Sequence, residues 1–146
     1  FTLSNADYEG RLINQKIIDF CESNKNSYYF TSLGQKRYLS CLQYVDGVIG
    51  NSSSGLIEVP SFKKGTIDIG NRQKGRVKCS SVIECKCNKN DIRKALDRLY
   101  SDKFQGSLFN TKNPYGDGGA SIRIIDIVKK INLDKLINKK FHDINF

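Results

Sequence analysis

The stretch from Val48 to Glu58 carries residue types that could hold a phosphate. A short apolar run ends in three consecutive serines, and a helix is expected to begin at once after them. The free backbone N–H groups and partial positive charge of a helix N-terminus suit a phosphate, and serine hydroxyls add further donors. Gly50 and Gly55, which flank the serines, would let the backbone come close to a ligand. The sequence therefore predicts a phosphate-binding turn.

Glu58 lies four residues after Ser54, on the same face of the expected helix. A carboxylate is poorly suited to face a phosphate, but it can accept hydrogen bonds from a ribose diol, as acidic residues do in dinucleotide folds. The same residues fit a serine-capped helix that carries an exposed glutamate. On this motif alone, both interpretations stay open.

A basic loop forms the second candidate segment. Six basic residues against the single Asp68 occur between Lys63 and Lys78, and Arg72 and Arg76 follow an apolar run at 65–70. The planar guanidinium fork of arginine matches phosphate oxygens. A solvated surface loop or a nucleic-acid patch would have the same composition, which does not separate these alternatives.

Alternating strands and helices would position these residues. Apolar runs predict strands at 28–31, 45–50, 65–70 and 81–85, and residues 1–3 also have strand character. Helical spacing predicts helices at 8–22, 35–44, 54–61, 90–100 (capped by Asn90) and 120–131. This order indicates an α/β fold, a Rossmann-like parallel sheet with helices on both faces. Ligands bind beyond the carboxyl ends of such strands, where strand order reverses.

Composition narrows the class of protein. The net charge of +9, from 24 Lys and Arg against 15 Asp and Glu, favours an anionic partner. The chain has no apolar run of about 20 residues and no signal peptide, so we expect a cytoplasmic protein without a membrane partner. Five cysteines without a C-x-x-C pair predict reduced, mostly buried thiols, no metal site and no cofactor. The lone His142 is expected on the surface.

The chain contains no Met, even at position 1, which predicts that it is part of a longer protein. Together, its motifs resemble the C-terminal half of hydrolysing UDP-N-acetylglucosamine 2-epimerases, in order over roughly residues 1–130. The matching segments are Ser4-Asn5-Ala6-Asp7, Ser32-Leu33-Gly34, Tyr38-Leu39-Ser40, residues 50–62, residues 69–76 and Asn113-Pro114-Tyr115-Gly116-Asp117-Gly118.

The resemblance implies the C-terminal lobe of a two-lobed fold similar to the GT-B glycosyltransferases. Residues 1–131 would form this nucleotide-binding lobe, incomplete at its N-terminus, and 132–146 a basic, partly ordered tail. It also implies the contacts of a bound UDP. Asn5 and Arg72 would hold the nucleotide and its phosphates, Ser52 and Ser53 the diphosphate, and Glu58 the ribose hydroxyls. Leu33 and Tyr38 would border the uracil, although Tyr38 replaces the Phe of some members.

The resemblance implies a reaction in which anti elimination of UDP is followed by addition of water, which gives free N-acetylmannosamine. The carboxylates that serve as acid and base in the family come largely from the N-terminal lobe, so we expect this chain to bind without turnover. Its expected partner is UDP-N-acetylglucosamine or a close analogue, with no nucleic acid and a homo-oligomeric parent protein. Open alternatives are a related UDP- or GDP-linked amino sugar, a non-catalytic nucleotide-binding module and a small basic nucleic-acid binder.

Overall fold

The computed structural model describes residues 1–4 and 9–132. The chain divides into two compact units, Phe1–Tyr115 and Gly116–Phe146, which are described separately. Asn5, for which the resemblance implies a nucleotide contact, and His142, which is expected on the surface, lie outside the described residues. The predicted lobe boundary at residue 131 stays a prediction.

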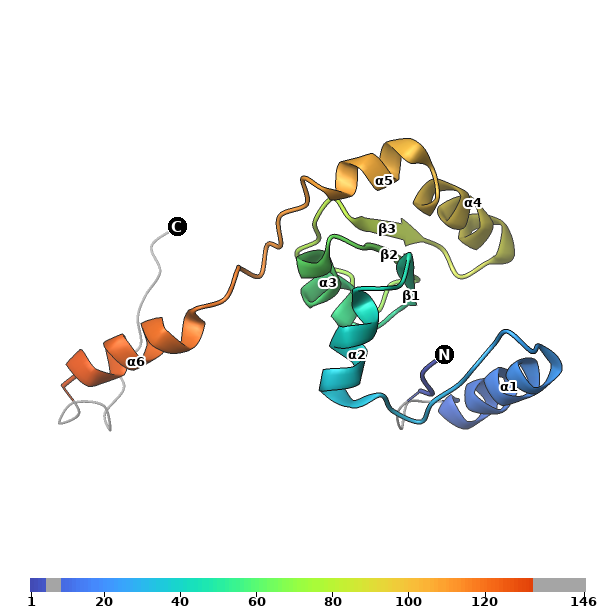
Figure 1. The fold of residues 1–146 in the computed structure, drawn as a ribbon, viewed down its shortest axis with the longest axis horizontal. Coiled ribbons are helices and arrows are strands. Elements are labelled where there is room, and N and C mark those ends of the chain that lie inside the picture. The colour runs from blue at the N-terminus through green and yellow to red at the C-terminus, as the bar shows by residue number, and fades with distance from the viewer. Residues whose placement is uncertain (5–8, 133–146) are drawn as a thin grey trace. The chain divides into compact units, whose positions relative to one another are not determined.

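A three-stranded parallel sheet forms the centre of the first unit (Figure 1). Its strands are β1 (Gly47–Gly50), β2 (Gly65–Ile69) and β3 (Val82–Cys85), in the order β1-β2-β3. Gly50 pairs with Asp68, so the carboxyl ends of β1 and β2 lie at the same edge. Three predicted strands and the α/β class are confirmed. Strand order follows the chain, so the expected reversal does not occur among the described strands.

The N-terminal segment forms less sheet than the sequence predicts. Thr2 and Phe30 make an isolated parallel bridge, in which the Leu3 amide donates to the Phe30 carbonyl at 3.0 Å. The next element in the chain is α1 (Gly10–Ser23). The Phe1 ring packs edge to face against the ring of Phe20 on this helix, with the ring centroids 5.8 Å apart. The apolar spacing at Ile13, Ile17, Phe20 and Cys21 predicts one buried stripe on this helix, but Ile13 and Phe20 are exposed and only Cys21 is buried.

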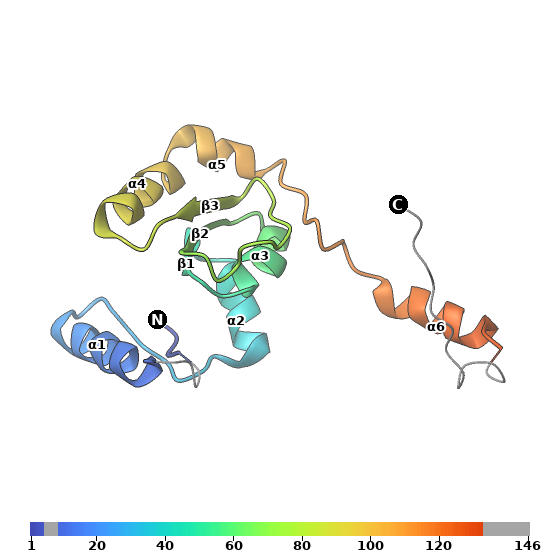
Figure 2. The same cartoon turned by 180° about the vertical axis from the view of Figure 1, so that it is seen from behind.

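One face of the sheet is covered by α4 (Lys89–Leu99) and α5 (Asp102–Leu108), as both views show (Figures 1 and 2). The core between them consists of Ile67, Ile83, Ala95, Leu99, Phe104 and Leu108. A Cβ on Gly65 would lie 2.3 Å from Leu99 Cδ1, so glycine is needed for this close packing. The sequence did not predict α5. In α4, Ala95 and Leu99 are buried, whereas Leu96 and the C-cap residue Tyr100 are exposed.

The cap of α4 also differs from the expectation. The side-chain oxygen of Asn88 accepts a hydrogen bond from the Asp91 amide at 2.9 Å, and the backbone at Asn88 is extended. Asn90 therefore lies in the first turn of the helix and does not cap it. An Asn side chain satisfies the amide three residues on, which places the cap two residues earlier than predicted.

The opposite face carries α3 (Ser54–Ile57) and the 3-10 turn η1 (Val59–Phe62), and α2 (Gly34–Leu42) precedes β1 in the chain. Thr66 of β2 faces α3 and donates its hydroxyl to the Gly55 carbonyl at 2.8 Å. Leu56 of α3 and Val59 of η1 are fully buried. Helices on both faces of the parallel sheet are therefore confirmed.

The described part of the second unit consists mainly of α6 (Ala120–Lys130), which matches the last helix expected from the sequence. Gly119 caps it in a left-handed conformation that glycine adopts readily. Its isoleucines and Val128 are exposed. Among the described residues, no helix is both long and apolar enough to cross a membrane.

The cysteines are less buried than the sequence predicts. All five are free thiols, but only Cys21 is buried, whereas Cys41 and Cys87 are exposed. Cys85 is partly buried, and this burial, followed by the charges of Asp91 and Asp68, raises the pKa of its thiol. The expectation of mostly buried thiols is therefore wrong.

Candidate functional site

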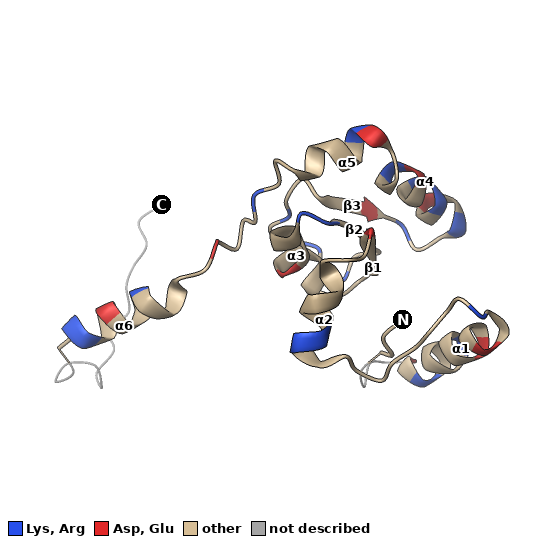
Figure 3. Cartoon of the chain, viewed as in Figure 1, with Lys and Arg blue, Asp and Glu red and all other residues tan. Residues whose placement is uncertain are grey.

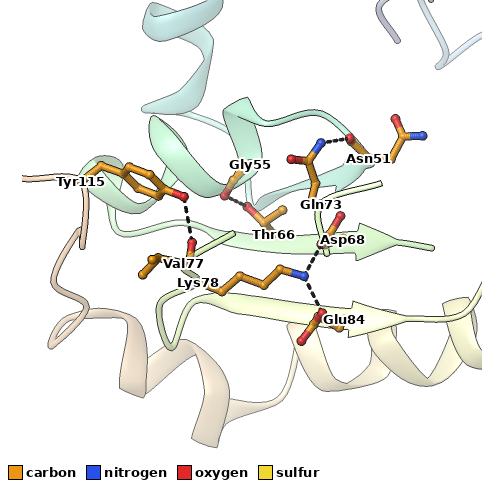
Figure 4. A network of polar contacts seen from close by, with 9 residues as sticks. All are labelled: Asn51, Gly55, Thr66, Asp68, Gln73, Val77, Lys78, Glu84 and Tyr115. Atoms are coloured by element: carbon orange, nitrogen blue, oxygen red, sulfur yellow. Dashed lines mark hydrogen bonds and ion pairs between the residues drawn. The ribbon is translucent and has the colours of Figure 1, made fainter. Parts of the chain in front are cut away.

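The serine turn and the basic loop meet at the carboxyl edge of the sheet. Asn51 follows β1, and Arg72 and Gln73 follow β2. Arg72 Nη1 lies 3.5 Å from Asn51 Oδ1. Gln73 Nε2 donates to the Asn51 carbonyl at 2.7 Å, as Figure 4 shows. The parallel pairing of β1 with β2 thus brings together two segments about twenty residues apart in sequence, as the α/β pattern requires.

Gln73 is a positioning residue that the sequence reasoning missed. Its side chain is only 3% exposed, although it belongs to a loop rich in charge. Its amide bond to Asn51 attaches the basic loop to the serine turn. No periodicity marks a polar loop residue as buried, so no signal in the sequence distinguished Gln73 from its exposed neighbours.

The serine turn consists of Ser52, Ser53 and Ser54 and leads into α3. Ser52 is exposed, Ser53 is the N-cap residue, and Ser54 is the first helical residue. Ser53 makes no side-chain cap hydrogen bond, and the Ser52 hydroxyl accepts from the Ser54 amide at a long 3.4 Å. The hydroxyl of Ser53 is therefore not used in capping, contrary to the serine-cap interpretation that the sequence left open.

Tyr38 contacts the first residue of α3, and Glu58 follows the last residue of that helix. Tyr38, on α2, is hydrogen-bonded through its hydroxyl to the hydroxyl of Ser54. Partial burial raises the pKa of Tyr38; the bond to Ser54 opposes this, and the negative charge of Glu58 adds to it. Glu58 itself is exposed at the end of α3, and Leu33 is the partly buried N-cap residue of α2.

Gly55 has a different role from the one expected. A Cβ at this position would lie 2.5 Å from Thr66 Cγ2, so the absence of a side chain lets α3 pack closely on β2. The hydrogen bond from Thr66 to the Gly55 carbonyl fixes the same contact (Figure 4). The sequence predicts close approach of a ligand at Gly55, whereas in the structure the residue allows close approach of β2.

An ion-pair network that includes a buried carboxylate lies at the ends of β2 and β3. Asp68, at the carboxyl end of β2, is 1% exposed and accepts from Lys78 Nζ at 2.9 Å, and Lys78 also pairs with Glu84 (Figure 4). Burial alone would lower the pKa of Lys78, but the hydrogen bonds and charges of Asp68 and Glu84 raise it. This lysine of the basic loop is therefore engaged within the fold.

The Asn113–Tyr115 segment connects both halves of the site. Asn113 Nδ2 donates to the Ile57 carbonyl at 2.8 Å and to Ser61 Oγ at 2.7 Å. The Tyr115 hydroxyl donates to the Val77 carbonyl at 3.0 Å (Figure 4). This short segment is therefore hydrogen-bonded both to the backbone next to Glu58 and to the backbone at the end of the basic loop.

A separate cavity of about 780 Å³ lies between β3 and α4, lined among others by Asn71, Cys85, Lys94 and Arg98. It does not include the predicted nucleotide contacts.

Lys and Arg are spread over α1, α2, α4, α5, α6 and the loops, so the charge of the described residues is not gathered on one element (Figure 3). Nor do these residues contain a group of three or more His, Cys, Asp or Glu that could hold a metal ion.

Sequence comparison relates the chain to a known family of proteins. The family model described as UDP-N-acetylglucosamine 2-epimerase matches residues 1–129. The chain is 41% identical over 143 residues, 98% of its length, to the "Polysialic acid biosynthesis protein P7" of Escherichia coli, covering 36% of that protein. It is 40% identical over 146 residues, 99% of its length, to the "GDP/UDP-N,N'-diacetylbacillosamine 2-epimerase (hydrolyzing)" of Campylobacter jejuni, covering 38%.

A third relative, the "UDP-N,N'-diacetylbacillosamine 2-epimerase (hydrolyzing)" of Legionella pneumophila, is 31% identical over 92% of this chain and 35% of its own length. The chain thus spans little more than a third of the length of these relatives. The family model covers most of the chain, including the serine turn, the basic loop and the Asn113–Tyr115 segment. The chain therefore belongs to the UDP-N-acetylglucosamine 2-epimerase family.

Proposed function

We propose that this chain is the UDP-binding part of a hydrolysing 2-epimerase that acts on UDP-N-acetylglucosamine in the biosynthesis of sialic-acid-type sugars. The observation that carries the proposal is the contact between Arg72 and Asn51, which places an arginine beside a serine turn at the carboxyl edge of a parallel sheet. Serine hydroxyls, helix N-terminal amides and a guanidinium together suit a diphosphate.

The remaining assignments are those that the resemblance to the family implies. Ser52, Ser53 and Arg72 would hold the diphosphate, and Glu58 the ribose hydroxyls at the far end of α3. Tyr38 and Leu33, both on α2 or its cap, would border the uracil. Asn5 would add a contact to the nucleotide, as the resemblance implies.

The chemistry in this proposal is elimination of UDP followed by addition of water to the resulting glycal. It requires an acid and a base beside the sugar. We assign these groups to the part of the relatives' length that this chain does not span. The chain then contributes the binding energy of the nucleotide, and Arg72 stabilises the negative charge that develops on UDP as it leaves.

The identity of the sugar is the finer part of the proposal. The name of the Legionella relative specifies a 2-epimerase of UDP-linked diacetylbacillosamine. The name of the Campylobacter relative gives either GDP or UDP as the linked nucleotide. The name of the Escherichia coli relative places it in polysialic acid biosynthesis, which favours N-acetylmannosamine as the product. A related UDP- or GDP-linked amino sugar is the second candidate, on the strength of the 40% identity to the Campylobacter protein.

Release of UDP from the nucleotide sugar tests the activity. We expect this chain alone to bind UDP-N-acetylglucosamine without releasing UDP. The same sequence extended to the length of its relatives should release UDP and N-acetylmannosamine together. UDP release by the chain alone would contradict our placement of the acid and base. Activity of the extended protein only on a diacetylated or GDP-linked sugar would contradict the substrate.

A further inference from the structure

A hydroxyl pair links α2 to the serine turn. Tyr38 and Ser54 are sixteen residues apart, and their hydroxyl oxygens are hydrogen-bonded. Ser54 begins α3, and its amide in turn points to the Ser52 hydroxyl at 3.4 Å. The phenol therefore contacts the turn that would hold a diphosphate, not only the region that would hold a base.

The direction of this hydrogen bond decides what Ser54 can do. A serine hydroxyl has one proton to donate and two lone pairs to accept with. If the phenol donates to Ser54 Oγ, the serine proton stays available for another acceptor. Partial burial and the charge of Glu58 raise the pKa of Tyr38, so the phenol keeps its proton at neutral pH and is able to donate. Donation by the phenol also strengthens the serine as a donor through polarisation.

We propose that Tyr38 is a positioning residue for the diphosphate, because its hydroxyl holds Ser54 Oγ so that the Ser54 hydroxyl donates to a phosphate oxygen. This inference rests on the proposed function and adds Ser54 to the phosphate contacts. It separates two roles of one side chain. The ring borders the base, and the hydroxyl acts on the phosphate through Ser54.

Tyr38→Phe isolates the hydroxyl, because it keeps the ring. We would titrate the unaltered chain, Tyr38→Phe, Ser54→Ala and the double variant with UDP by calorimetry, and with uridine by ligand-observed NMR. Tyr44→Phe is the matched control, since Tyr44 follows α2 and is 86% exposed. Thermal unfolding without ligand shows whether each variant retains the fold.

We expect Tyr38→Phe to weaken UDP about threefold to tenfold, the range for one hydrogen bond, and to leave uridine affinity unchanged. The double variant should be no weaker than Ser54→Ala, because both changes remove the same contact. Tyr44→Phe should bind like the unaltered chain.

If the unaltered chain binds UDP but Tyr38→Phe binds it equally well, the inference falls and the proposed function stands. Equal losses of UDP and uridine would also overturn it, since the hydroxyl would then act on the base. If the unaltered chain binds no UDP, the proposed function fails and this inference fails with it.

Discussion

At the scale of single residues, Asn51 is the point where the two halves of the site meet. Its side chain lies beside Arg72, and its carbonyl accepts from the buried Gln73. The arginine thus lies at the edge of the serine turn, in a loop that the Gln73 hydrogen bond attaches to this turn. Such preorganisation lowers the cost of ordering a long side chain when a ligand binds.

Arg72→Ala should therefore weaken UDP binding by about 1.5–3 kcal/mol, the range for hydrogen bonds to charged groups. Calorimetric titration measures the loss. Lys74→Ala, in the same loop and exposed, is the matched control and should change affinity little. An unchanged affinity of the Arg72 variant would remove this residue from the site.

Glu58→Gln should weaken UDP more than 2'-deoxy-UDP. The carboxylate would accept hydrogen bonds from the ribose diol, and a charged acceptor makes stronger bonds than an amide. We would compare both ligands with the unaltered chain and the variant at the same salt concentration. Equal losses for the two ligands would argue against contact with the diol.

At the scale of elements, the position of α3 depends on one close contact with the sheet. Gly55 lies against Thr66, and a Cβ at Gly55 would come within 2.5 Å of Thr66 Cγ2. Gly55→Ala should lower the free energy of unfolding by about 1–3 kcal/mol, the cost of overpacking a core. Thr66→Ser removes the obstructing methyl group but keeps the hydroxyl.

The double variant Gly55→Ala/Thr66→Ser should recover much of the loss, as urea denaturation would show. Such non-additivity is expected for residues in contact. Additive destabilisation would mean that the serine turn is not positioned by this contact.

The Asp68–Lys78–Glu84 network gives an element-scale prediction with a defined pH dependence. Lys78→Met leaves the buried Asp68 carboxylate unpaired and should cost about 3 kcal/mol of unfolding free energy, near the low end for a broken buried pair. Lys74→Met is the control.

Since the pKa of Lys78 is raised on folding, its contribution is fully present below the ordinary lysine value of 10.5. It is lost as pH rises through the folded pKa. The difference between the unaltered chain and the variant should thus be constant between about pH 6 and 9 and shrink in more alkaline solution. A difference that grows with alkaline pH would contradict the assignment.

Hydrophobic periodicity predicted the regular elements well and the irregular ones poorly. The runs at 65–69 and 82–85 are strands that bury Ile67 and Ile83 in the core. The run at 47–50 is also a strand, although its Ile49 is 49% exposed. By contrast, α5 has seven residues, contains Gly106 and buries only Phe104 and Leu108, too little for a visible pattern. Phe30 was expected in a strand, but it makes only an isolated bridge with Thr2, although aromatic residues favour strands.

At the site, the sequence indicated which segments would meet but not how they are held. Ser52 and Arg72 follow neighbouring parallel strands, which suffices to place them at one edge. The positioning contacts made by Gln73, Tyr38 and Asn113 join residues far apart in the chain. Contacts of this kind depend on tertiary structure, which no local pattern encodes.

At the scale of the whole molecule, the chain spans 36–38% of the length of the relatives from Escherichia coli and Campylobacter jejuni. Most of the positioning contacts around the serine turn nevertheless come from within Phe1–Tyr115. We therefore expect nucleotide affinity to be retained by this chain, even though we assign catalysis to the extended protein.

Calorimetric titration of the chain with UDP, with GDP and ADP as controls, tests this account most directly. We expect UDP to bind in preference to both, because the serine turn and Arg72 hold the diphosphate and Tyr38 and Leu33 border the uracil. A preference for GDP would keep the site but contradict the proposed substrate. A folded chain that binds none of the three nucleotides would contradict the central claim that this edge of the sheet is a nucleotide site.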